Sequence, residues 1–523
     1  MNFEPTTTWY LALVPELALV ILLIAIQVYS RVLPSDKQRG VGLMTAWGAL
    51  AVIFLTVGLY LLGDVPNRAA DIQGLTDSLI WGGMIRNDMV TFVFRIMFFF
   101  ALMITALISV DIERLQAVEY YALLIIATMG FSLMAASADL IMLYIALEMA
   151  SISSYILAGY LKNEDRSTES GMKYFVYGAF ATGLMLYGMS LLYGVTVPFF
   201  NGVGQTNIYA LGNLFQNMPP LDALQGAEGV FVQNVNGVLL LAAVLIVAGF
   251  GFKISAVPYH FWTPDVYEGS PTAFTAFLST ASKAAAFAVF IRVFTAGVFG
   301  PLQSNQAWWI MLLTMCVITM TLGNLSAIFQ NNIKRMLAYS SIAQAGYALL
   351  GLVILTPDGA GATMFYLLMY VFTNIAAFGV IIVVTASARS ESMEELYGLN
   401  KRSPYLALVM MIALLSLGGI PPTAGFLGKF YLFQATVNAG YWWLALIGIL
   451  NAFVALYYYL NVIKYMYLYD SDKEALEIPV SRSVWVGLGI STLGIILLGI
   501  FSSPAYELTL QAAGAFYSLA AGG

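Results

Sequence analysis

The chain has 523 residues, of which 60% are hydrophobic and only 10% are charged, and its mean hydropathy is +0.83. Because a soluble domain carries roughly 25% charged residues, this composition excludes a soluble globular protein and indicates a polytopic membrane protein with no nucleic-acid partner. Cys316 is the only cysteine and His260 the only histidine. They are too few for iron–sulfur ligation, a disulfide within the chain or a conventional zinc site.

Apolar runs bounded by charged or Gly/Pro-rich breaks predict an all-α fold of about fourteen transmembrane helices, since a helix needs about 20 mostly apolar residues to cross a bilayer. The predicted spans are 9–29, 41–62, 88–110, 118–136, 139–160, 172–196, 237–262, 272–296, 307–329, 337–355, 362–386, 404–431, 437–466 and 483–502. No soluble block interrupts them, so we expect a single integral membrane domain over 1–523. Its expected parts are N-terminal helices (1–116), a first repeat (117–296), a second repeat (307–466) and a C-terminal helix with its tail (483–523).

The basic residues are distributed unequally between the two sides of these predicted spans. The loops after odd-numbered spans, with the adjoining span ends, hold Arg31, Lys37, Arg39, Arg114, Lys162, Arg166, Lys173, Lys334, Arg335, Arg389, Lys401, Arg402, Lys464, Lys473 and Arg482. The loops after even-numbered spans hold only Arg68 and Arg86. The positive-inside rule therefore places the odd loops on the cytoplasmic side and both termini outside. On the outside, we expect 207–215 to be either a surface helix or an ordered loop, and 503–519 to be an amphipathic tail.

Two of the predicted spans are interrupted by glycine and proline. The seventh runs through Ala248-Gly-Phe-Gly-Phe-Lys253 to Pro258, and the twelfth through Ser416-Leu-Gly-Gly-Ile-Pro-Pro422 to Lys429. Both are expected to unwind near mid-membrane, because proline removes a backbone donor and clashes with the preceding turn. Spans five helices apart have opposite orientations, so the pattern predicts an inverted five-helix repeat with two discontinuous helices, which is the sequence pointer to a transport site.

Five basic residues fall inside otherwise apolar stretches: Arg95, Lys253, Lys283, Arg292 and Lys429. A charged side chain at mid-membrane costs at least ~2.5–3.5 kcal/mol, so such residues usually face protein or water and serve a function. Glu148 also lies mid-span. If Glu148 and Lys253 pair, opening the pair would push a proton onward to Lys283, because a lysine and a carboxylate change each other's proton affinity.

Each of these residues also has a structural interpretation. Lys283 could form a static buried ion pair, and Lys429 could extend to the interface. Arg95 and Arg292 could be held by helix-end carbonyls or lipid headgroups. His260 suits a proton relay but is as often a packing residue beside aromatic rings. Lys173 is most simply an anchor at the positive side, with a weaker possible role in the relay.

Several motifs resemble the antiporter-like subunits of proton-pumping NADH:quinone oxidoreductase, respiratory complex I. They are His260-Phe-Trp-Thr-Pro-Asp-Val-Tyr-Glu-Gly-Ser-Pro-Thr272, Phe277-Leu-Ser-Thr-Ala-Ser-Lys283, Ile333-Lys-Arg-Met-Leu-Ala-Tyr-Ser-Ser341, Gly419-Ile-Pro-Pro-Thr-Ala-Gly-Phe-Leu-Gly-Lys-Phe430 and Leu456-Tyr-Tyr-Tyr-Leu-Asn461. The Trp-Thr-Pro-Asp-Val-Tyr run points to the subunit N (subunit 2) family. The resemblance implies fourteen helices and a hydrophilic axis, with Glu148 and Lys253 as a coupled pair, Lys283 as the central relay and Lys429 as the distal lysine.

The resemblance also implies a non-redox subunit of a proton-translocating enzyme in a bacterial plasma membrane or another energy-transducing membrane such as the thylakoid. Its expected partners are the lipid bilayer, an antiporter-like neighbour and small membrane-arm subunits. No Gly-rich dinucleotide fingerprint or cluster cysteines are present, so NADH, FMN, iron–sulfur clusters and quinone are expected in partner subunits. Two alternatives remain: a subunit of a multi-subunit cation/proton antiporter, and a structural membrane-arm subunit.

Overall fold

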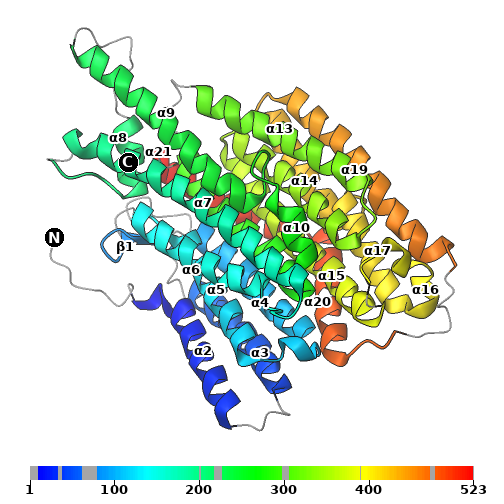
Figure 1. Ribbon diagram of the computed structural model, residues 1–523. Helices are drawn as coiled ribbons and strands as arrows, with labels where there is room; N and C mark the ends of the chain where they lie inside the picture. Colours follow the sequence, from blue (N-terminus) through cyan, green and yellow to red (C-terminus); the bar gives the residue numbers. More distant parts are fainter. Residues whose placement is uncertain are drawn as a thin grey trace.

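The computed structural model describes residues 10–32, 38–61, 79–199, 202–216, 227–296, 306–388, 390–470 and 478–521. The predicted basic residues Lys37, Arg68, Arg389 and Lys473 lie outside these ranges. Nearly all of the described chain is helical (Figure 1). The all-α polytopic fold expected from composition is therefore confirmed.

The first half of the chain contains a short β-hairpin and the helices up to residue 296. Its elements are α2 (Val14–Val32), α3 (Arg39–Leu61), β1 (Leu79–Ile80), β2 (Ile85–Arg86), α4 (Met89–Ser109), η3 (Glu113–Leu115), α5 (Val118–Ala136), α6 (Leu140–Ala158), α7 (Asp165–Thr196), η4 (Val197–Phe199), α8 (Ile208–Gln216), α9 (Ala227–Ile254), α10 (Trp262–Gly269), α11 (Thr272–Phe277), η6 (Leu278–Ser282), α12 (Lys283–Phe290) and η7 (Ile291–Ala296). The antiparallel pair β1–β2 is a difference from the sequence prediction, in which no strand was expected. Two-residue strands are too short to leave a periodic pattern.

The second half contains the remaining helices. They are α13 (Gln306–Ile328), α14 (Ile333–Val353), α15 (Pro357–Ala388), η8 (Met393–Leu396), α16 (Leu399–Arg402), α17 (Pro404–Gly418), α18 (Ala424–Asn438), α19 (Trp442–Leu468), α20 (Arg482–Ile500) and α21 (Ser503–Ala521). Among the described residues, 13 helical segments are long and apolar enough to cross a membrane. The pair α17 and α18 supplies the remaining predicted span as two shorter pieces.

Both predicted interruptions are present. The seventh predicted span stops at Ile254, and the chain becomes helical again only at Trp262. The twelfth stops at Gly418 and resumes at Ala424. Gly419 ends α17 in the left-handed conformation, at φ +83°, which explains why a glycine is placed there.

The most buried helices form the centre of the molecule. The segment Thr272–Phe294 is buried along its whole length, and α4, α14 and α15 are almost as enclosed. The helices α2 and α3 form one edge in Figure 1 and α19 lies at the opposite edge, and less than half of each is buried. A charged group on the segment Thr272–Phe294 is therefore expected to have polar partners within the protein.

Contacts between loops agree with the predicted sidedness. Arg39 pairs with Asp111, Arg114 with Glu164, and Lys401 with Asp470, and all six residues belong to loops or helix ends on the predicted inner side. On the outer side, Thr206 bonds to Asp139 and Asn207 bonds to the carbonyl of Gly83. If the predicted number of spans were wrong by one, some of these contacts would join residues predicted to lie on opposite sides of the membrane.

The two predicted surface segments are helices. The segment 207–215 corresponds to α8, so the helical alternative was the correct one. The tail 503–519 lies within α21, which packs against α15, α4 and α8. It thereby fastens the C-terminal part of the described chain to the central helices.

Candidate functional site

Lys253 lies in the last turn of α9, immediately before the first break, and is buried. Its Nζ donates to Ser151 Oγ of α6 at 2.7 Å. The rings of Tyr155 and Tyr174 lie 5.5 and 5.7 Å from the amine, close enough for cation–π attraction. The first lysine is thus held by one hydroxyl inside an aromatic enclosure.

Glu148 lies on α6 one turn before Ser151, so the two side chains share a face of that helix. In the described residues, Glu148 Oε1 is buried without a hydrogen-bond partner. The lysine bonds to the serine, and the carboxylate lies one turn away. A coupled pair of Glu148 and Lys253 therefore remains a prediction.

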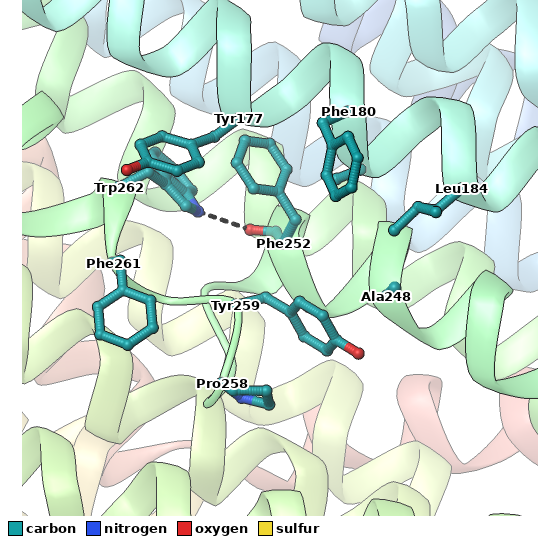
Figure 2. Close-up of a pocket in the computed structure, with 10 residues that line it drawn as sticks. Tyr177, Phe180, Leu184, Ala248, Phe252, Pro258, Tyr259, Phe261 and Trp262 are labelled. Atoms are coloured by element: carbon teal, nitrogen blue, oxygen red, sulfur yellow. Dashed lines mark hydrogen bonds between the residues drawn. The ribbon is translucent and has the colours of Figure 1, made fainter.

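The break after Lys253 is bordered on one side by an apolar cavity of about 160 Å³. Aromatic side chains of α7, α9 and the 255–261 segment surround it, and Trp262 Nε1 donates at 2.9 Å to the carbonyl of Phe252, which the break leaves free (Figure 2). A cavity with such a lining offers water few partners and tends to stay dry.

Lys283 is fully enclosed at the junction of the π-helix η6 and α12. Its Nζ donates to both the backbone oxygen and the hydroxyl of Ser341, each at 2.6 Å. Tyr370 donates to the same hydroxyl at 2.8 Å, and Tyr267 OH lies 3.4 Å from it. The expected alternative of a static ion pair does not apply, since both acceptors of the lysine are uncharged.

One turn beyond Ser341, Gln344 continues the row of polar groups along α14. Gln344 Nε2 donates to Tyr459 OH at 3.1 Å and to the carbonyl of Leu417 at 3.2 Å. Tyr459 also bonds to Ser340, and Tyr366 donates to Gln344 Oε1. Side chains three apart on a helix are neighbours. Successive turns of α14 therefore carry polar groups from Lys283 to the second break.

Lys429 lies at that break, on α18, and is buried. Its Nζ donates to the carbonyls of Leu417 at 2.8 Å and Gly418 at 3.3 Å, and the ring of Tyr347 lies 4.8 Å away. These carbonyls end α17 and lack helical partners, and a cation is favoured at the negative end of the helix dipole. Lys429 and Gln344 share the Leu417 oxygen. Extension of Lys429 to the membrane interface, the alternative interpretation, is thus not observed.

The two weaker candidates are peripheral to this row. His260 stacks on Phe261 in the 255–261 segment, and in the described structure its Nδ1 is buried without a hydrogen-bond partner. Lys173 is partly exposed and pairs with Glu169 at 2.6 Å and Asp265 at 2.8 Å. Both contacts suit an anchor at the inner face.

Arg95 and Arg292 have carboxylate partners that the sequence did not indicate. Arg95 pairs with Glu16 of α2 at 2.8 Å. Arg292 Nη2 contacts Asp88, the N-cap of α4, at 2.6 Å. Each arginine also donates to a backbone carbonyl, Arg95 to that of Ala12 at 3.0 Å and Arg292 to that of Ala135, near the end of α5, at 2.6 Å. Carbonyls and carboxylates of distant helices therefore hold both arginines, in agreement with their structural interpretation.

Sequence reasoning missed the neutral residues around the lysines: Ser151 and Ser341, which bond to them, and Gln344 and Tyr459, which continue the polar row. Ser341 stands in the quoted Ile333–Ser341 motif, but a hydroxyl in a small-residue helix gives no signal of its own. One indication was present. The loosely matching runs Glu148–Tyr155 and Ser340–Tyr347 end in the two tyrosines whose rings face Lys253 and Lys429.

Comparison with known proteins identifies the family of this chain. Residues 137–455 match the family model described as NADH:quinone oxidoreductase/Mrp antiporter, TM. The chain belongs to this family. The matched region includes the two breaks and all three buried lysines, together with Glu148.

Members of this family with curated names resemble the chain over nearly its whole length. NADH-quinone oxidoreductase subunit N of Moorella thermoacetica is 40% identical over 488 residues, covering 92% of this chain and 94% of the relative. NAD(P)H-quinone oxidoreductase subunit 2 of Trichormus variabilis is 37% identical over 511 residues, covering 95% and 91%.

Solved structures of the family have the same fold. A chain of respiratory complex I from Thermus thermophilus with bound aureothin matches with a TM-score of 0.73 and 29% identity, covering 94% of this chain and 98% of that one. A chain of the Mrp complex from Dietzia matches with a TM-score of 0.78 at 19% identity, covering 97% and 98%. The second likeness concerns the fold alone.

Proposed function

We propose that this chain is an antiporter-like, proton-translocating membrane subunit of a complex I-type NADH:quinone oxidoreductase. Proton movement through the row Glu148, Lys253, Lys283 and Lys429 is coupled to quinone reduction in other subunits. NADH, FMN and iron–sulfur clusters belong to those partners, and the neighbours of this chain are an antiporter-like subunit and small membrane-arm subunits.

The observation that best supports the mechanism is the pair of hydrogen bonds from Lys283 to Ser341. A lysine in the most buried helix has only a hydroxyl and a carbonyl as acceptors, both at 2.6 Å. Neutral acceptors do not hold a proton on the amine as a carboxylate would. The hydroxyl of Ser341 also accepts from Tyr370, so the lysine is connected to further groups that exchange protons.

The polar row on α14 would lead a proton between Lys283 and the second break. Ser341 and Gln344 lie on successive turns of α14, and Gln344 shares the Leu417 carbonyl with Lys429. The hydrogen bonds of the described residues do not connect Lys253 to Lys283, whose neighbourhoods are separated by aromatic rings. That step requires water or a rearrangement, and it is the natural place for a gate.

The alternative with the most support is a cation/proton antiporter subunit, because the Mrp fold is shared. It differs in predicting sodium-dependent flux. The identity of about two residues in five to subunits named for NADH-quinone oxidoreductase favours the first function. A purely structural membrane-arm subunit would not require an enclosed row of lysines with neutral partners.

The proposal is tested by Lys283→Ala in the intact complex, with the proton-to-electron ratio measured in sealed membranes. We expect the complex to assemble and reduce quinone while the ratio falls by the share of this subunit. Lys401→Ala, which removes an exposed lysine paired with Asp470, serves as the matched control. An assembled Lys283→Ala complex that pumps at the wild-type ratio would overturn the proposal.

A further inference from the structure

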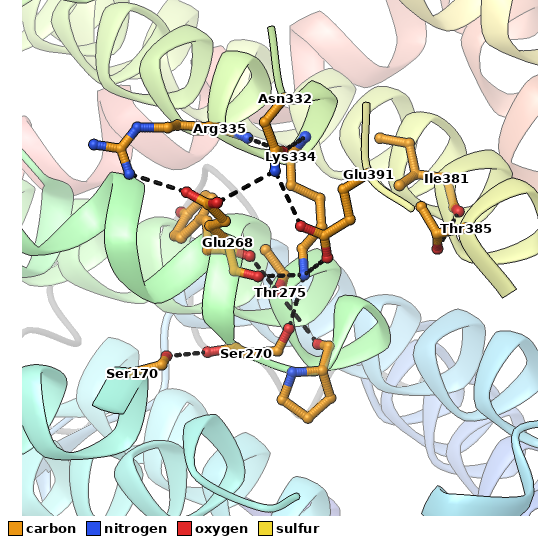
Figure 3. Close-up of polar contacts among 12 residues, drawn as sticks. Ser170, Glu268, Ser270, Thr275, Asn332, Lys334, Arg335, Ile381, Thr385 and Glu391 are labelled. Carbon is orange, nitrogen blue, oxygen red and sulfur yellow. Dashed lines mark hydrogen bonds and ion pairs between the residues drawn. The ribbon is translucent and has the colours of Figure 1, made fainter. Parts of the chain in front are cut away.

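At the predicted inner face, a network of charges joins the two repeats. Lys173 and Arg335 both contact Asp265, at 2.8 and 2.9 Å, and Arg335 also pairs with Glu268 at 3.0 Å. Asp265 and Glu268 belong to α10 in the first repeat, and Arg335 opens α14 in the second. Most of this network is partly exposed, but its central member, Lys334, is buried (Figure 3).

Lys334 has one acceptor for each of its three ammonium hydrogens. Its Nζ donates to Glu391 Oε1 at 2.9 Å, to the carbonyl of Glu268 at 2.7 Å and to the carbonyl of Ser270 at 3.0 Å. The last two oxygens lie at the C-terminal end of α10, where a cation complements the helix dipole. Such a network fixes how α14 lies against the end of α10. If Lys334 lost any one of its partners, a buried ammonium hydrogen would be left without an acceptor.

Glu391 is itself fastened to the start of α14. Its backbone oxygen accepts from Ile333 N at 3.0 Å, and Asn332 donates to its carboxylate at 3.1 Å. On the opposite side, Ser170 of α7 lies 2.8 Å from Ser270, hydroxyl to hydroxyl. A Cβ added at Gly269 would come within 2.4 Å of the Arg166 carbonyl, so α7 and α10 are in close contact there. The end of α10 is thus clamped from two sides.

This clamp lies on the same helices that place Ser341 against Lys283. Ser341 is seven residues, about two turns, beyond Lys334, so both side chains lie on one face of α14. Tyr267 of α10 approaches the Ser341 hydroxyl at 3.4 Å. The segment that begins after the Ser270 cap leads directly to Lys283 through α11 and η6.

We infer that Lys334 and Glu391 are positioning residues that set the register of α14 against the α10–α11 corner and so hold Ser341 in place for proton transfer at Lys283. This inference rests on the proposed function. A shift of α14 along α10 would move Ser341 away from the amine, and displacements of about 1 Å in a reacting geometry reduce rates by about 10²-fold.

The test is Lys334→Met in the intact complex, with assembly, quinone reduction and the proton-to-electron ratio all measured. We expect assembly and quinone reduction to persist while the ratio falls, although by less than it does in Lys283→Ala. Glu391→Gln, whose amide oxygen still accepts from Lys334, should cause a smaller loss, and it also serves if Lys334→Met fails to assemble. Lys401→Met is the control.

A double variant separates positioning from general destabilisation. If Lys334 acts through Ser341, the loss in Lys334→Met with Ser341→Ala will be smaller than the sum of the two single losses, because the sites are coupled. Fully additive losses, or a wild-type ratio in assembled Lys334→Met and Glu391→Gln, would overturn the inference. A wild-type ratio in Lys283→Ala would instead overturn the proposed function.

Discussion

The two discontinuous helices hold their lysines by different means. Lys253 precedes its break and bonds to a serine hydroxyl, with the Glu148 carboxylate one turn away on the same helix. Lys429 follows its break and bonds only to the carbonyls that the break frees. The common features are a tyrosine ring beside each amine and a cis proline bond within each interruption. The two predicted repeats thus share a tyrosine ring and a proline at the break. Among the described residues, a carboxylate lies one turn from the lysine's hydrogen-bond partner only in the first.

The largest expected effect comes from removing that carboxylate. We expect Glu148→Gln to abolish the contribution of this subunit to proton pumping, because Lys253 then has no carboxylate partner to exchange with. The measurement is the proton-to-electron ratio of a normally assembled complex. Glu119→Gln, an exposed carboxylate at the start of α5, is the control. A wild-type ratio in Glu148→Gln would remove the distinction between the halves.

The next effect concerns the row on α14. We expect Gln344→Leu to lower the proton-to-electron ratio strongly, although less than loss of a lysine, because it disconnects Tyr459 from the carbonyl that Lys429 shares. Leucine has a similar volume, so the helix contacts should persist. If the ratio is unchanged, protons reach Lys429 by another route.

A smaller expected effect is a difference in stability between variants of the Lys253 and Lys429 sites. Lys429→Met leaves the carbonyl of Gly418 without its lysine partner in a buried place, a loss of about 1–3 kcal/mol. In Lys253→Met, the Ser151 hydroxyl loses its lysine donor but still donates to the carbonyl of Leu147. We therefore expect the larger fall in thermal stability for Lys429→Met, measured on the purified complex. Equal falls in thermal stability would mean that the two lysine sites contribute equally to the stability of the fold.

The smallest effect is the acid sensitivity of the inner-face network. Burial raises the pKa of Asp265, but hydrogen bonds and charges of Lys173 and Arg335 outweigh it, and the pKa lies below its ordinary value. The network therefore stabilises the fold above the ordinary pKa of aspartate, about 3.9, and this contribution is lost as the pH falls through the lowered value. Solvent screening limits it to about 1 kcal/mol or less.

The control for that prediction is Asp265→Asn, in which this part of the acid dependence should disappear from thermal unfolding curves. Glu119→Gln should leave the pH dependence as it is in the wild type. Retention of the full acid dependence in Asp265→Asn would assign it to other carboxylates of the inner face.

The sequence predicted the arrangement of spans because hydropathy, basic-residue placement and proline breaks are local signals. Lys253, Lys283 and Lys429 were found for the same reason, since a charge in an apolar run is conspicuous. Their surroundings were not, because Ser341 and Gln344 become significant only when the fold brings them to Lys283 and to the carbonyl of Leu417. Glu16 and Asp88 were missed likewise, since their arginines lie on distant helices.

The carbonyl seat of Lys429 has a consequence for how a proton can leave it. Backbone oxygens accept hydrogen bonds from an ammonium and from a neutral amine alike, and a neutral amine keeps two hydrogens for its two acceptors. The carbonyls of Leu417 and Gly418 can therefore accept hydrogen bonds from Lys429 both before and after it loses a proton. No unpaired anion remains when the proton leaves. If protons move as proposed, the hydrogen-bond acceptors of Lys429 stay satisfied in both charge states. In the first half, the Glu148 carboxylate on the neighbouring turn would favour the charged form of Lys253.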